Sequence, residues 1–76
     1  MSKWSPCKRR LFIKKLKKLG FNGPETGGRH EFMLYAPHKQ TIPNNEEFSI
    51  PQLRKLITQV EQKIGRDISI EEWRKL

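Results

Sequence analysis

The sequence is poor in cysteine, in long apolar runs and in acidic residues. Its 76 residues include one cysteine, Cys7, which excludes an intramolecular disulfide framework and a multi-cysteine metal site and suits the reducing cytoplasm. No stretch approaches the roughly 18 consecutive apolar residues of a membrane span. The basic residues near the N-terminus are not followed by the apolar segment of a secretory signal. We therefore expect a cytoplasmic protein without a membrane segment.

The shortage of acidic residues leaves a strong positive charge. Sixteen Lys and Arg residues stand against eight Asp and Glu residues, for a net charge of +8. This balance predicts a polyanionic partner, nucleic acid first and an acidic protein or an anionic membrane second. Only 34% of the residues are apolar, so we expect one small domain with a thin core, whose chemistry would depend on one or two side chains.

The first predicted element is a basic amphipathic helix. Ser5 is suited to its N-cap and Pro6 to its first position, and Gly20 is suited to the left-handed residue that ends a helix. Phe12 and Leu16 belong to its apolar stripe. The opposite face carries seven basic residues: Lys8, Arg9, Arg10, Lys14, Lys15, Lys17 and Lys18.

Three short strands are predicted next. The alternating segment 29–35 is typical of a strand, and Gly27 and Gly28 before it predict a hairpin turn. A weaker first strand begins near Phe21, and "HKQTIP" forms a third that ends at Pro43. Short strands joined by tight turns predict an antiparallel meander.

Two further helices carry clear start signals. Ser49 and Gln52 form a capping box before a helix that Gly65 ends, and Ser69 precedes a short helix over 70–76. Two helices on one face of a three-stranded antiparallel sheet bury both apolar stripes, so the fold class is α+β. We expect residues 1–65 to form the domain and residues 66–76 a helical extension packed on or next to it.

His30 lies at the start of the central strand and is separated from the glycine pair by Arg29. Because side chains alternate along a strand, we expect His30 on the helix-facing side with Phe32 and Leu34. One interpretation is a half-buried histidine packed at the edge of the sheet. The other is a general acid or base, since imidazole titrates near neutral pH. Gly27 and Gly28 would let a substrate approach closely and Arg29 would bind phosphate oxygens, a combination suited to RNA cleavage.

The remaining polar residues give weaker signals. His38 is expected in a turn or surface role, and Glu46 and Glu47 in a solvated loop. No set of His, Cys or carboxylate residues has the spacing of a metal site, so we expect neither a metal nor another cofactor. The basic helix face is either simply solvated or a surface for a polyanion, whose binding would weaken steeply with salt.

Four motifs between Cys7 and Gly65 occur in the order and spacing of a known family. With "KKLGF", "GGRHEFML", "QTIPNN" and "FSIPQLRKLITQV", the chain resembles the HicA toxins of bacterial toxin–antitoxin pairs. The resemblance implies a small double-stranded-RNA-binding-like fold, α-β-β-β-α, and metal-independent cleavage of mRNA by one histidine, which corresponds to His30. It also implies a HicB-type antitoxin as partner. Arg29 stands where a small hydroxyl residue is common in the family, and Asn44 where a histidine is common.

The leading hypothesis is therefore an endoribonuclease toxin that acts on mRNA without a cofactor, with His30 as its catalytic residue. The predicted RNA-binding residues are Gly28, Arg29, Lys39, Lys8, Arg10, Lys14 and Lys18. The alternative is a non-catalytic RNA-binding module of the same fold, although "EEFSIPQLRK" is acidic where double-stranded-RNA binders carry lysines. A DNA-binding or partner-docking protein is a third hypothesis, which rests on charge alone.

Overall fold

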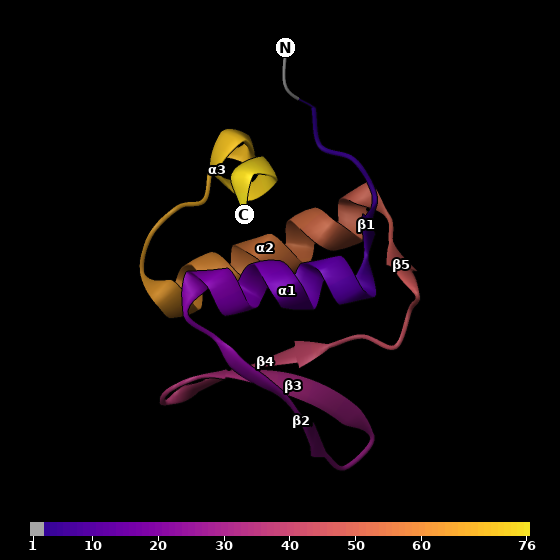
Figure 1. Ribbon diagram of the computed structural model, residues 1–76, viewed down its shortest axis with the longest axis vertical. Helices are drawn as coiled ribbons and strands as arrows, with labels where there is room; N and C mark the ends of the chain where they lie inside the picture. The colour runs from indigo at the N-terminus through magenta and orange to yellow at the C-terminus, as the bar shows by residue number, and fades with distance from the viewer. Residues whose placement is uncertain (1–2) are drawn as a thin grey trace.

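The computed structural model describes residues 3–76 as one small α+β unit with three helices and five strands (Figure 1). In chain order the elements are β1 (Cys7–Lys8), α1 (Arg9–Leu19), β2 (Asn22–Gly27), β3 (His30–Tyr35), β4 (His38–Ile42), β5 (Glu47–Phe48), α2 (Ile50–Ile64) and α3 (Ile70–Lys75). No helix in this range is long and apolar enough to cross a bilayer.

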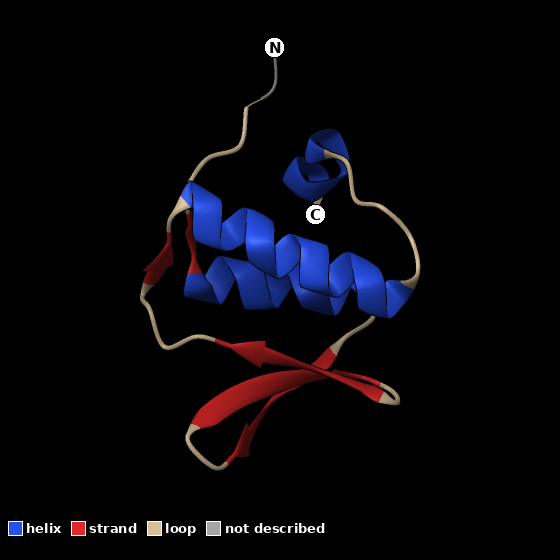
Figure 2. Ribbon diagram, turned by 180° about the vertical axis from the view of Figure 1, so that it is seen from behind, coloured by secondary structure: helices blue, strands red, loops and turns tan. Residues whose placement is uncertain are grey.

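The main sheet has three antiparallel strands in the order β2-β3-β4, and the helices lie on one side of it (Figures 1 and 2). This confirms the predicted sheet and the helices on one face. The other face of the sheet is covered by no element of the described chain (Figure 2). The hairpin turn falls at Gly28 and Arg29, one residue later than the glycine pair predicted.

The prediction of which face of β3 meets the helices is wrong. Met33 is fully buried, and its cross-strand partner Gln40 is buried with it. Alternation then places His30, Phe32 and Leu34 on the uncovered face of the sheet. Both faces of this strand carry apolar side chains, so alternation within β3 alone does not distinguish them.

The start of α1 also differs from the prediction. The helix begins at Arg9 rather than at Pro6, and its N-cap is Lys8, which makes no side-chain capping bond. The residues before it are extended because Cys7 and Lys8 pair with Phe48 and Glu47 in a two-stranded ladder that the sequence analysis did not predict. The other predicted ends are confirmed: Gly20 and Gly65 are left-handed, and Ser49 and Ser69 accept backbone bonds.

The core lies between the helical layer and the sheet and includes part of the C-terminal segment. Phe12 has no exposed surface, and its ring centroid lies 5.3 Å from that of Phe48 and 5.6 Å from that of Trp73. Lys15 of α1 donates to the carbonyl of Trp73 at 2.7 Å and lies 5.3 Å from its ring centroid. Residues 66–76 therefore share the buried cluster with α1 and α2.

Candidate functional site

The uncovered face of the sheet carries a small set of polar and aromatic side chains around β3. The register pairs His30 with Gly27, and it pairs Phe32 with Glu25 on one side and Thr41 on the other. Cross-strand partners share a face, so these side chains lie on the same uncovered side. One row further along β3, Asn22 and Lys39 flank Leu34 in the same way.

His30 is exposed and lies at the first position of β3. Within residues 3–76 its imidazole makes no hydrogen bond, ion pair or ring contact. The interpretation as a half-buried structural histidine is therefore wrong, because His30 lies on the side of the sheet away from the core. An imidazole without protein partners keeps both ring nitrogens available for proton transfer.

The turn before His30 leaves its surroundings open. Gly28 has a φ of +77°, a conformation that L side chains rarely adopt, and a Cβ there would meet nothing within 4 Å. Arg29 follows it, exposed and without a partner in the described chain. Gly28, Arg29 and His30 therefore lie at one exposed corner of the sheet. The expected open approach at Gly27 is wrong, because a Cβ there would lie 2.6 Å from the ring of Phe32.

On the helix side of the sheet, opposite His30, the start of β3 is bound by an arginine of α1. Arg9 forms an ion pair with Glu31, and its Nε donates to the carbonyl of Pro43 at 2.9 Å. Glu31 follows His30 in the chain and points to the opposite face. Arg9 therefore stabilises the fold through these contacts and does not belong to the exposed basic face predicted for the first helix.

Lys39 contacts an aromatic ring that the sequence analysis did not include in the site. Its Nζ lies 4.9 Å from the centroid of Phe32. Alternation with the apolar residues inward predicts Phe32 in the core. Because β3 carries apolar residues on both faces, one of these two sets must lie outside the core.

The four predicted RNA-binding residues near or on α1 are exposed but do not converge on His30. They are Lys8, Arg10, Lys14 and Lys18. Lys8 and Arg10 line a pocket of about 370 Å³ with Arg9 and Glu46. Since Arg9 contacts Glu31, this pocket lies at the His30 end of the sheet. Lys18 lies about 12 Å further along the helix axis than Arg10, toward the other end.

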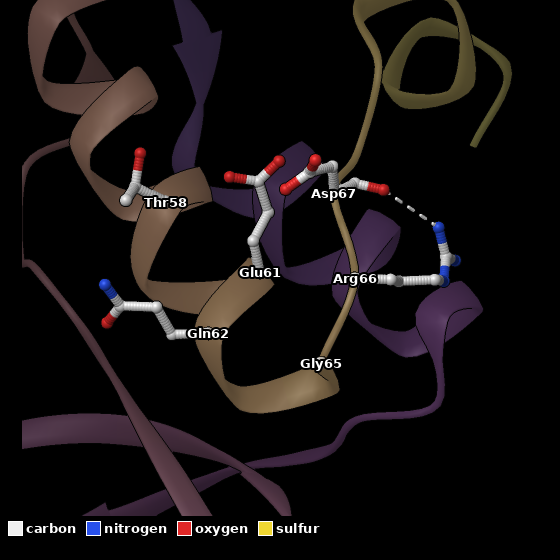
Figure 3. A pocket seen from close by; sticks show the side chains of 6 residues that line it. All are labelled: Thr58, Glu61, Gln62, Gly65, Arg66 and Asp67. Carbon is white, nitrogen blue, oxygen red and sulfur yellow. Dashed lines mark hydrogen bonds between the residues drawn. The ribbon is translucent and has the colours of Figure 1, made fainter.

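A second polar pocket forms where α2 meets the C-terminal segment (Figure 3). Its lining includes Glu61, which accepts a 2.6 Å bond from the backbone of Ile68. Arg66 pairs with Glu72 at 2.7 Å, and this contact lowers the pKa of the Glu72 carboxyl. These polar groups fix the connection to α3, and none of the predicted site residues lines the pocket.

Within the described residues, neither the cysteine nor the metal-ligating side chains form a second candidate site. Cys7 is buried, and burial raises the pKa of its thiol, which favours the unreactive protonated form. No group of three or more His, Cys, Asp or Glu side chains within residues 3–76 is placed to hold a metal ion. His38 is exposed at the start of β4, opposite Tyr35.

Comparisons with known proteins add no relative. No protein-family model matches the chain, and no match was found among curated proteins or among solved structures. The likeness to the HicA toxins consequently rests on the motifs of the sequence.

Proposed function

We propose that this protein is a cytoplasmic endoribonuclease, the toxin of a type II toxin–antitoxin pair, and that it cleaves mRNA without a metal. The observation that carries the proposal is the exposed, unpartnered imidazole of His30 beside the open turn at Gly28 and Arg29. It is supported by the net charge of +8 and by the motifs shared with the HicA family.

The chemistry requires one group that accepts and returns a proton. His30 takes the proton of a ribose 2′-OH, and the resulting oxygen attacks the adjacent phosphorus. The bond to the 5′-oxygen breaks, and that oxygen takes up a proton from the imidazolium, leaving a 2′,3′-cyclic phosphate and a free 5′-OH. Arg29 would hold the non-bridging phosphate oxygens, because its planar guanidinium matches their geometry.

The surrounding cations supply affinity more than chemistry. Lys8 and Arg10 lie at the His30 end of the sheet but on its helix side, and would hold phosphates beyond the cleaved bond. Lys14 and Lys18 are further along the helix and would contact more distant phosphates. A HicB-type antitoxin, as the partner that the resemblance implies, would inhibit the protein by covering the corner around His30.

The test is incubation of the purified protein with RNA, with and without EDTA. We expect equal cleavage in both conditions and no cleavage of DNA of the same sequence, because DNA lacks the attacking 2′-OH. Cyclic phosphate ends on the products would identify the nucleophile. RNA binding without cleavage would instead establish the non-catalytic RNA-binding module.

Binding should depend on salt through the exposed lysines of α1. Replacing Lys14 and Lys18 with Gln should reduce the slope of log K against log salt by about 0.7 per lysine for single-stranded RNA. The control is Lys75→Gln, an exposed lysine of α3, which should leave the slope unchanged. An unchanged slope in the Lys14, Lys18 variant would show that this helix face is merely solvated.

A further inference from the structure

The uncovered face of the sheet carries one aromatic ring in an unusual position. Phe32 lies on the side away from the helices, yet its side chain is only partly exposed. The reason is that the ring leans across β2, where a Cβ at Gly27 would lie 2.6 Å from Cε1 of Phe32. Gly27 is the cross-strand partner of His30, so the ring leans toward the row that holds the imidazole.

The two strands beside Phe32 carry side chains of opposite charge. Lys39 on β4 places its ammonium 4.9 Å from the ring centroid. Glu25 on β2 is the cross-strand neighbour on the other side. A phosphate backbone that crosses this face would therefore run on the Lys39 side, and Glu25 would repel it from the β2 side.

We propose that Phe32 is a base-stacking subsite that restricts the substrate to single-stranded RNA. This inference rests on the proposed function for its consequence in cleavage. A base stacks on Phe32, the ammonium of Lys39 moves from the ring to the adjacent phosphate, and the neighbouring ribose lies over His30. His30 and Phe32 are two residues apart, about 7 Å along the strand, a separation that one extended nucleotide can bridge.

The geometry favours an unpaired strand for a physical reason. In a duplex the faces of the bases are already stacked on each other and cannot reach an aromatic side chain. An unpaired base offers a free π-face to Phe32, and every base has one, so recognition would tolerate different sequences. The cation beside the ring adds phosphate affinity at the same point.

The experiment uses a His30→Ala background, so that binding is measured without cleavage. A labelled single-stranded RNA and a duplex of the same length are titrated against this protein and against the same protein with Phe32→Leu. We expect Phe32→Leu to weaken single-strand binding by about 5- to 150-fold and duplex binding by less than about twofold. Phe32→Tyr, which keeps the ring, should restore single-strand binding. Leu11→Ala, at an exposed apolar residue of α1, is the matched control and should change neither.

A second measurement does not depend on any substitution at Phe32. In NMR spectra of the His30→Ala protein, single-stranded RNA should move the Phe32 ring signals upfield and the duplex should not. Equal losses for both RNAs with Phe32→Leu, or ring signals that do not respond to the single strand, would overturn the inference. Because these readouts are of binding, they stand even where the parent protein fails to cleave RNA, which would overturn only the proposed function.

Discussion

Replacing His30 with alanine should reduce the rate of RNA cleavage by at least about 100-fold, because a positioned general acid or base contributes about two to four powers of ten. The imidazole has no partner within residues 3–76, so its removal breaks no contact of the fold. We therefore expect an unchanged melting temperature, retained RNA binding and loss of growth arrest on expression. The measurements are single-turnover cleavage of a labelled RNA and thermal melting of the same preparation.

The matched control is His38→Ala, since His38 is the other histidine and is also exposed. It lies at the opposite end of β3 from His30, across from Tyr35. Its removal should leave the cleavage rate within about twofold of the parent. A His30→Ala protein that cleaves RNA at the parent rate, or a His38→Ala protein that loses activity, would contradict the assignment of His30.

Replacing Phe12 with alanine should destabilise the fold by about 3–5 kcal/mol. Its ring is fully buried and contacts Phe48 of β5 and Trp73 of α3. The substitution therefore opens a cavity between α1, β5 and α3. Small domains have total stabilities near the lower end of about 5–15 kcal/mol. We expect a large shift of the urea midpoint and a substantial unfolded fraction without urea.

The control is Leu11→Ala, one position earlier on α1, where the side chain is 45% exposed. It should change the free energy of unfolding by less than about 0.5 kcal/mol. A Phe12→Ala protein that unfolds at the same urea concentration as the Leu11→Ala protein would show that the ring is not central to the core.

The helix ends could be predicted from the sequence because the determining interactions are local. Ser49 and Ser69 each accept a bond from a residue three positions on, and Gly20 supplies a backbone conformation that its own lack of a side chain allows. The start of α1 could not be predicted in this way. It is determined by pairing with Glu47 and Phe48, about forty positions away, a contact for which residues 5–9 contain no signal.

The turn beside His30 could be placed from the sequence, but the face of the sheet that carries His30 could not. The glycine pair before the alternating segment predicts the turn, whereas the catalytic role of His30 rests mainly on the family resemblance and stays a prediction. Which face of β3 meets the helices could not be predicted, because Met33 and Phe32 are both apolar and either would suit the core. Contacts with distant parts of the chain determine the orientation, including the ion pair of Glu31 with Arg9 on the helix side.

The two glycines before Arg29 are constrained in different ways, and this determines which substitutions each position tolerates. Gly28 is constrained by its own backbone, with open space around it, so no change elsewhere would make a β-branched residue acceptable there. At Gly27 the three atoms nearest to an added Cβ all belong to the ring of Phe32. A chain without a ring at position 32 could therefore carry alanine or serine at position 27, so the two positions are expected to vary together.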